Sequence, residues 1–302
     1  MNFNSIDIFI GRVLPNGFLK DTYTRGMRRL AEYGLFTKGY VAKTHFNFLM
    51  HVDRLDAIKW YVHYFGYFEP QISKAWSNLL KPGNTVIDIG ANVGYYTLLA
   101  GRCVGDTGKV ISFEPSTHIY KQLLNNIALN SNMNIEAKQY AISDSVGLVD
   151  FYYAGDNIQG NSSIMASHGG KKMETVKTIS FDEIAEMLPL GEINLIKIDV
   201  EGAEALVLKT LEKYLSQLNP KCVIFLEISP ENIDTAAQML APFIENAFHI
   251  KQIANEYTTA FYNKEISVEL SNLNLESKKI QDLVLCRDVS QFQLLAGGPN
   301  NM

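Results

Sequence analysis

The stretch Val86–Thr97, VIDIGANVGYYT, decides the fold of this chain. Apolar residues lead into Asp88, two glycines follow at Gly90 and Gly94, and the residues after them begin a helical pattern. A strand, a glycine turn and a helix in this order bring helix N–H groups and a closely approachable backbone to a small ligand. The stretch therefore predicts the ligand-binding turn of an α/β domain.

Short apolar runs follow one another from Thr85 onward, mostly separated by helix-length segments. The runs cover residues 85–90, 109–115, 135–143, 193–202 and 221–229. Nearly continuous apolar strands that alternate with helices predict a mostly parallel sheet with helices on both faces. The predicted fold is a doubly wound, Rossmann-like α/β domain, and residues 249–258 and 281–288 are expected to close its sheet as an antiparallel pair.

The first 80 residues differ from the rest because they are rich in aromatic and basic residues and poor in strand and glycine signals. Apolar residues at helical spacing predict one helix over Lys43–Phe68 and another over Pro70–Leu80. We expect residues 1–80 to form a helical extension that packs on a ligand-binding domain of residues 81–302.

The ligand-binding domain carries a predicted β-insertion at residues 147–180. Residues 147–154 and 174–179 resemble two added strands, and the polar segment 155–172 lies between them. A glycine- and serine-rich loop of this length inside a compact domain is typical of a lid or a binding loop.

Composition limits the kinds of partner. The chain has 302 residues and a net charge of -5, which argues against broad binding to nucleic acid or to anionic membranes. Cys103, Cys222 and Cys286 show no paired or metal-ligand spacing, so we expect free thiols. No run of about 18 apolar residues occurs, and we expect a soluble, cytoplasmic protein.

The glycine turn differs from two common phosphate-binding patterns. A dinucleotide fingerprint has a glycine where this chain has Asn92, and no Gly-Lys-Ser or Gly-Lys-Thr follows. Acidic residues instead end the predicted strands, namely Asp88, Glu114, Asp199, Glu201 and Glu227. Carboxylates repel a pyrophosphate but hold a cation that carries hydroxyls and an ammonium group. S-adenosylmethionine is such a ligand.

Several strand-end residues can be given tasks around this ligand. Glu114 ends the second strand, where it can accept hydrogen bonds from both ribose hydroxyls. Asp88 can order the turn or reach the ammonium group through water. Ala141 and Ile142 end the third strand, where they either flank the adenine or belong to the ordinary core.

Three motifs in fixed order carry a family resemblance: IDIGANVG at residues 87–94, FEP at 113–115 and KIDVEGAE at 197–204. Over about residues 67–227 the chain resembles the FkbM family of S-adenosylmethionine-dependent methyltransferases. The resemblance implies a class I methyltransferase fold, with a seven-stranded sheet that ends in an antiparallel hairpin. It also implies O-methylation of a hydroxyl on a small molecule, sugar or glycoconjugate.

The same resemblance assigns cofactor contacts. Around the methionine part of the cofactor it places Asp88, Gly90, Ala91, Asn92, Gly94 and Tyr95. Around the ribose and the adenine it places Glu114, Pro115 and Ser116.

Methyl transfer to a hydroxyl is an in-line displacement, helped by a base that accepts the hydroxyl proton. Asp199, at the end of the fourth strand, is the first candidate for base or acceptor orienter, and Glu201 is the second. Asp199 could instead only bind cofactor or cap a helix. Together with Glu227 these two acids could gather a divalent cation, although their spacing does not demand one and we predict no metal. His168 of the polar loop is either a base or a solvated side chain.

Two other classes of function stay open. A nicotinamide-dependent oxidoreductase shares the strand, turn and helix, but its glycine spacing differs. A methyltransferase-like binding module without catalysis would share the fold, but it need not keep all three motifs. Arg25, Arg28 and Arg29 could contact an anionic acceptor or form a solvated helix face.

Overall fold

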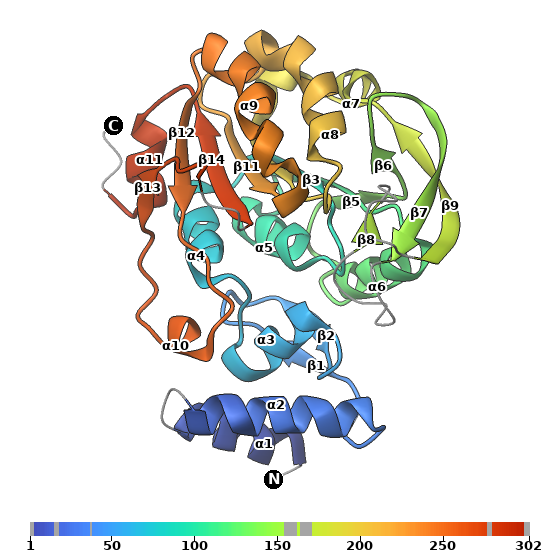
Figure 1. The fold of residues 1–302 in the computed structure, drawn as a ribbon, viewed down its shortest axis with the longest axis vertical. Coiled ribbons are helices and arrows are strands. Elements are labelled where there is room, and N and C mark those ends of the chain that lie inside the picture. The colour runs from blue at the N-terminus through green and yellow to red at the C-terminus, as the bar shows by residue number, and fades with distance from the viewer. Residues whose placement is uncertain are drawn as a thin grey trace.

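The computed structural model describes residues 3–14, 18–36, 38–153, 162–163, 171–276 and 280–298. Within them, the central sheet has eight strands in the order β13-β12-β14-β11-β10-β3-β4-β5 (Figure 1). In that order the strands are Leu270–Asn272, His249–Ile253, Gln281–Cys286, Val223–Ile228, Ile193–Ile198, Thr85–Ile89, Lys109–Phe113 and Ile135–Lys138.

The directions of these strands confirm the predicted class I methyltransferase fold. From β11 to β5 all neighbouring strands are parallel, whereas β14 is antiparallel to both β11 and β12. The predicted closing pair is therefore present, and the edge strand β13 makes the sheet one strand longer than the seven expected. The chain runs outward from β3 to β5 and then returns to β10 beside β3, so the topological switch point lies between β3 and β10.

Alternate residues of the parallel strands feed two separate core layers. Val86 belongs to one layer and Ile87 to the other, because successive side chains of a strand point to opposite faces. The first layer packs on α4 (Pro70–Leu79), α5 (Tyr95–Val104), α6 (Thr117–Ala128) and α11 (Ser290–Leu295). The second packs on α7 (Phe181–Met187), α8 (Glu204–Leu211) and α9 (Ala236–Glu245). Burial on both faces explains the continuous apolar runs of the sequence.

The N-terminal part corrects one prediction. Its elements are α1 (Phe3–Val13), α2 (Phe18–Glu32), β1 (Tyr40–Lys43), β2 (Leu49–Val52) and α3 (Ala57–Phe65). The predicted helix over Lys43–Phe68 is wrong in its first half, where β1 and β2 form an antiparallel hairpin. The helix predicted from Pro70 is confirmed as α4, while the division of the chain at residue 80 stays a prediction.

The hairpin forms because α6 and the turn after it supply its missing partners. The backbone N–H of Leu49 donates to the Asn130 side chain at 2.9 Å, and that of His51 donates to Asn126 at 2.8 Å. Asn47 adopts the left-handed conformation that the turn needs, with φ of 66°. These contacts fix a strand where local spacing alone also fits a helix.

The predicted insertion is a second sheet of four strands among the described residues. Its order is β6 (Ala141–Ile142), β9 (Lys171–Ile179), β7 (Gly147–Tyr153) and β8 (Ser162–Ser163). The antiparallel pairing of β7 with β9 confirms the two added strands. Most of the predicted lid at 155–172, including His168, lies outside the described residues.

The remaining elements are short. They are α10 (Thr259–Tyr262) and the 3-10 helices η2 (Leu190–Glu192), η3 (Glu212–Gln217) and η4 (Pro230–Thr235). Cys103, Cys222 and Cys286 are free thiols, as predicted. In the part of the chain that the structure describes, no helix combines the length and the apolar character needed to cross a membrane.

Candidate functional site

A pocket of about 640 Å³, including its open mouth, lies at the carboxyl ends of β3, β4 and β10. This is the edge of a doubly wound sheet at which ligands bind. Of the thirteen predicted site residues, the pocket brings together Gly90, Asn92, Glu114, Pro115, Ala141, Ile142, Asp199 and Glu201. The sequence pattern therefore identified residues from several separate segments that meet around one cavity.

Gly90 occupies a position where no side chain fits. It has φ of 81°, and a Cβ atom there would lie 1.7 Å from the backbone oxygen of Asp199. The N–H groups of Gly90 and Ala91 both donate to the Phe113 carbonyl, at 3.0 and 2.9 Å. The first glycine of the motif thus allows the ends of β3 and β10 to approach each other and form the floor of the pocket.

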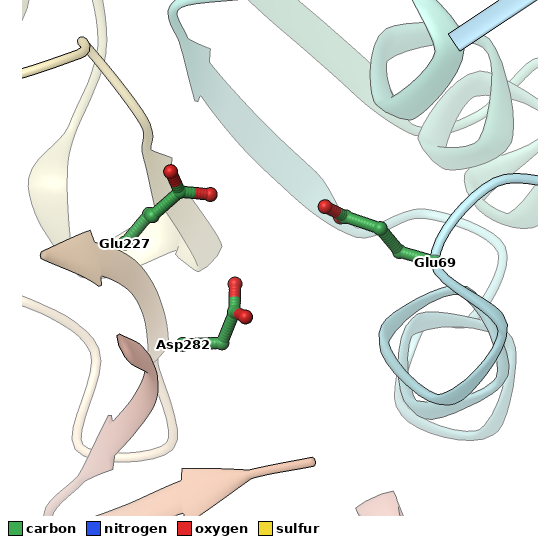
Figure 2. Close-up of side chains that lie close together, drawn as sticks. All are labelled: Glu69, Glu227 and Asp282. Carbon is green, nitrogen blue, oxygen red and sulfur yellow. The ribbon is translucent and has the colours of Figure 1, made fainter. Parts of the chain in front are cut away.

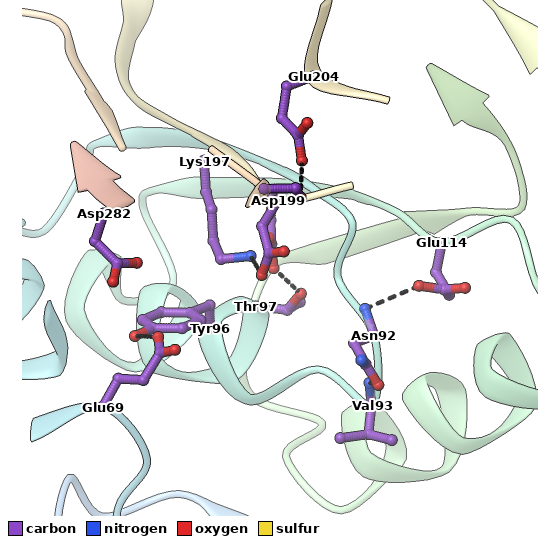
Figure 3. Close-up of polar contacts among 12 residues, drawn as sticks. Glu69, Asn92, Val93, Tyr96, Thr97, Glu114, Lys197, Asp199, Glu204 and Asp282 are labelled. Carbon is purple, nitrogen blue, oxygen red and sulfur yellow. Dashed lines mark hydrogen bonds and ion pairs between the residues drawn. The ribbon is translucent and has the colours of Figure 1, made fainter. Parts of the chain in front are cut away.

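Glu114 is a buried carboxylate that the turn holds from two sides. One oxygen accepts from the Asn92 N–H at 2.9 Å (Figure 3), and the other accepts from the Ser116 N–H at 2.9 Å. Burial raises the pKa of Glu114 to about 7, although both backbone donors oppose the shift. A carboxylate oxygen can accept a second hydrogen bond, so each oxygen retains capacity for a ligand hydroxyl.

Buried Lys197 forms an ion pair with Asp199, which is partly exposed and lines the pocket; the Lys197 Nζ lies 2.7 Å from the Asp199 Oδ2 (Figure 3). Burial alone would lower the pKa of Lys197, but the Asp199 and Asp88 carboxylates outweigh it and raise that pKa. Asp88 accepts from the Thr97 hydroxyl at 2.6 Å, and its Oδ1 atom has no hydrogen-bond partner among the described residues. The ammonium group of Lys197 thus offsets part of the negative charge of Asp199 and Asp88.

Sequence reasoning missed Glu69, which stands directly before α4. Its carboxylate accepts from the Tyr96 hydroxyl at 2.5 Å, from the Tyr257 hydroxyl, and from the Asn255 amide at 3.2 Å. Asn255 also donates to Asp282 at 3.1 Å. The only local signal was an acidic residue before a helix-starting proline, which normally indicates a cap. No such cap bond exists here, since the Glu69 side chain turns toward the site.

Glu69 belongs to a cluster of carboxylates. Glu227 and Asp282 face each other on the paired strands β11 and β14, and both point toward Glu69 (Figure 2). Two overlapping triads, Glu69 with Glu227 and Asp282, and Asp199 with Glu201 and Glu227, have carboxylate oxygens within 4.8 Å of one another. All of these acids except Glu201 line a smaller pocket, which shares Asp199 with the first one. The cation that the sequence left open would find its oxygen ligands here.

Burial and the nearness of other acids raise the pKa values of these carboxyl groups. Burial, with the nearby Asp199 carboxylate, raises the pKa of Glu201 to about 8. Burial raises the pKa of Glu227 well above its usual value, and Asp199 and Asp282 add to the shift. Some of these carboxylates therefore hold protons near neutral pH, which makes them able to exchange a proton with a ligand.

Glu204, also missed, organises the loop after β10. It accepts from the Gly202 N–H at 2.8 Å and from the Ser229 hydroxyl at 2.7 Å, and it also binds the Asn232 amide. These bonds hold Glu201 in a left-handed conformation with φ of 49°. Glu204 thus fixes the segment that carries the candidate catalytic acids.

Five predicted cofactor residues do not line the pocket: Asp88, Ala91, Gly94, Tyr95 and Ser116. Asp88 is fully buried under the turn. The Tyr95 hydroxyl lies 3.0 Å from the Ser73 hydroxyl within the core, and Gly94 packs against Leu123. In this structure these residues shape the turn from behind, and their contact with a cofactor stays a prediction.

The strand order and the acidic pocket at the switch point are those of a class I methyltransferase domain. Residues 88–258 match the Methyltransferase FkbM domain, which is more than half of the chain. The chain therefore belongs to the FkbM methyltransferase family, whose methyl donor is S-adenosylmethionine.

The individual proteins that resemble this chain match only part of its sequence. The chain is 30% identical over 159 residues to methyltransferase sdnD from Sordaria araneosa, across 42% of this chain and 60% of that protein. It is 32% identical over 133 residues to hexuronic acid methyltransferase AglP from Haloferax volcanii, across 44% of this chain and 52% of that protein. The match thus spans less than two thirds of either relative. A solved SAM-dependent O-methyltransferase from Thermotoga maritima aligns with a TM-score of 0.41 and 12% identity, across 83% of this chain and 86% of that one.

Proposed function

We propose that this protein is an S-adenosylmethionine-dependent O-methyltransferase that acts on a hydroxyl of a small molecule, sugar or glycoconjugate. The observation that carries the proposal is the single pocket into which the glycine turn, Glu114 and the Asp199–Glu201 segment all project. Family membership supports methyl transfer, and the name of the relative AglP, a hexuronic acid methyltransferase, supports a saccharide acceptor.

The two ends of the pocket suit the two ends of the cofactor. Glu114 would accept the ribose hydroxyls, and the apolar side chains of Ala141 and Ile142 would pack on the adenine. Gly90 and Asn92 would border the methionine part. None of the described residues lining the pocket is Lys or Arg, so it offers nothing to neutralise the pyrophosphate of a nicotinamide cofactor.

Asp199 and Glu201 would act on the acceptor. The cofactor supplies an electrophilic methyl group on a sulfonium. Asp199, oriented by its 2.7 Å ion pair with Lys197, would accept a hydrogen bond from the acceptor hydroxyl and align its oxygen. Glu201, with a pKa near 8, would take the hydroxyl proton as the new C–O bond forms. The smaller acidic pocket next to Asp199 would hold the acceptor ring.

The acceptor is proposed to be a small molecule rather than a nucleic acid, because a net charge of -5 opposes a polyanion. One observation points instead toward RNA: a stretch of 68 residues is 37% identical to a 23S rRNA (uracil) methyltransferase, across 22% of this chain. A gel-shift assay with RNA checks this part of the proposal directly.

Calorimetric titration with S-adenosylhomocysteine and, separately, with NADH tests the cofactor. We expect the thioether to bind and NADH not to bind. Glu114→Ala is expected to weaken binding by about 1–3 kcal/mol, because the ribose loses its acceptor. A preference for NADH would contradict the proposal.

Incubation with methyl-labelled S-adenosylmethionine and a panel of hydroxylated acceptors tests the reaction. We expect a labelled product that survives alkali, because a methyl ether resists hydrolysis whereas a methyl ester does not. Cofactor binding without turnover on any acceptor would instead favour a binding module.

A further inference from the structure

A third cavity, which the proposed methyl transfer does not use, is lined by residues of α2, α3 and the segment that leads into α10. Figure 1 shows where these helices lie in the fold. Its lining is Asp21, Thr24, Arg25, Arg28, Trp60, Tyr61, Tyr257, Thr258 and Thr259. Two guanidinium groups and three aromatic rings therefore share one cavity. We propose that it binds the anionic part of a saccharide acceptor whose reacting hydroxyl lies at Asp199, an inference that rests on the proposed function.

Tyr257 connects this cavity to the acidic site. Its ring lines the cavity, while its hydroxyl donates to Glu69, which lines the pocket that Asp199 shares. The Tyr61 hydroxyl donates to the Tyr257 carbonyl at 2.9 Å and so fixes this segment against α3. Two side chains in direct contact, Tyr257 and Glu69, thus connect the lining of the cavity with that of the acceptor pocket. A ligand longer than one sugar ring could reach from one to the other.

The arginines are available to a ligand. The Arg25 Nη2 lies 3.9 Å from the Asp21 carboxylate, and its Nε donates to the Asp21 backbone carbonyl at 3.0 Å. The Arg28 Nε lies 3.7 Å from Glu32, and both arginines are at the surface of α2. Exposed pairs of this kind hold their side chains weakly, so either arginine can turn toward a ligand. Asp21 also lines the cavity and accepts the Thr259 hydroxyl, so its charge offsets one of the two guanidinium groups and leaves the lining with one net positive charge. Burial raises the pKa of Tyr61 to about 12 and the charge of Arg28 opposes the shift, which puts Arg28 near the Tyr61 ring.

The chemistry of this lining selects an oxyanion on a sugar. A guanidinium binds a carboxylate or a phosphate through two parallel hydrogen bonds. Aromatic rings pack against the apolar face of a sugar and leave its hydroxyls free to bind water or Thr258. A uronic acid and a phosphosugar share these two features, whereas a neutral sugar has only the second.

Binding of three matched probes tests the inference. Each is titrated into the protein saturated with S-adenosylhomocysteine: 4-nitrophenyl β-glucuronide, 4-nitrophenyl β-glucoside 6-phosphate and the neutral 4-nitrophenyl β-glucoside. We expect at least one anionic probe to bind about tenfold or more tighter than the neutral one. Which of the two binds tighter tells a carboxylate site from a phosphate site.

Variants on α2 separate this cavity from general surface charge. The double change Arg25→Gln and Arg28→Gln is expected to abolish the preference for the anionic probe. Arg29→Gln, an exposed neighbour outside the cavity lining, is the matched control and is expected to keep it. Equal binding of charged and neutral probes, no probe binding at all, or equal losses in the two variants would overturn the inference. S-adenosylhomocysteine titration of each variant reports separately on the proposed function.

Discussion

Replacing Glu114 by glutamine is expected to change how the stability of the protein depends on pH. Glu114 is 5% exposed, and the pKa of its carboxyl group rises from 4.5 to about 7 on folding, mainly through burial. The folded protein thus binds this proton more tightly than the unfolded chain. Its contribution to stability is fully present below pH 4.5 and is lost as the pH rises through 7.

The size of this loss of stability follows from the pKa shift of Glu114. Between pH 5 and pH 8 the ionisation of Glu114 is expected to lower the free energy of unfolding by roughly 2–3 kcal/mol. Glutamine does not titrate, so Glu114→Gln removes this component. In the variant an amide nitrogen would face the backbone N–H of Asn92 or Ser116. This lowers the free energy of unfolding by about 1–3 kcal/mol at every pH. The titration of Glu114 depends on pH and the lost hydrogen bond does not, so measurements at several pH values separate the two effects.

Urea unfolding followed by circular dichroism at pH 5, 6, 7 and 8 measures both effects. We expect the free-energy difference between wild type and Glu114→Gln to shrink by roughly 2–3 kcal/mol from pH 5 to pH 8. Glu212→Gln, at an exposed glutamate of η3, is the matched control and is expected to show no such trend. A constant difference between wild type and Glu114→Gln would refute the reasoning about burial.

Three further predictions concern the turn, the base and the metal. Gly90→Ala is expected to lower the free energy of unfolding by more than about 2 kcal/mol in chemical denaturation, because its Cβ would meet the Asp199 carbonyl; a near-native value would contradict the geometry. The kcat/KM for S-adenosylmethionine is expected to rise with pH up to about 8 as Glu201 of the free protein loses its proton, and a pH profile of Glu201→Gln lacking this rise checks the assignment. Incubation with EDTA is expected to change the rate less than about twofold, since Lys197 already supplies a positive charge beside Asp199; strong loss with recovery on adding Mg²⁺ or Mn²⁺ would show a metal in the cluster.

The sheet could be predicted from the sequence because each parallel strand is buried on both faces and so shows as an apolar run. The N-terminal hairpin could not, because its decisive bonds come from Asn126 and Asn130, about 80 residues further along the chain. Local spacing in that region fits a strand as well as a helix. The run at 135–143 was expected as one strand, but the structure divides it between the two sheets as β5 and β6.

The candidate site also has one part that could be predicted from the sequence and one part that could not. The side of the pocket formed by the glycine turn and Glu114 was predictable, because one local motif builds it. Glu69 and Tyr257 were not, since only tertiary packing brings them together across 188 positions of sequence. The sequence does contain a signal for Lys197, which is its charge within an apolar strand. A charged residue within a continuous apolar strand must have a buried partner, and Asp199 two positions later is that partner.

The backbone explains why so many acids can stay close together. Glu69, Asn92 and Glu201 all have positive φ, at 42°, 51° and 49°, although none is glycine. Each such conformation costs about 1–2 kcal/mol and persists only where the surroundings enforce it. Hydrogen bonds enforce two of these conformations: the Glu69 N–H donates to the Tyr262 hydroxyl oxygen, and the Asn92 N–H donates to the Glu114 carboxylate.

A rigid backbone prevents the carboxylates from moving apart to relieve their repulsion. Relief must therefore come from bound protons, from Lys197 or from a positively charged ligand. Protons serve this purpose in the free protein, since burial and neighbouring acids raise the pKa of Glu201 and Glu227. A sulfonium ligand would remove the need for those protons and leave Glu201 ionised at the moment when a base is required. The same repulsion that raises the pKa of the free site would thus favour both cofactor binding and proton transfer.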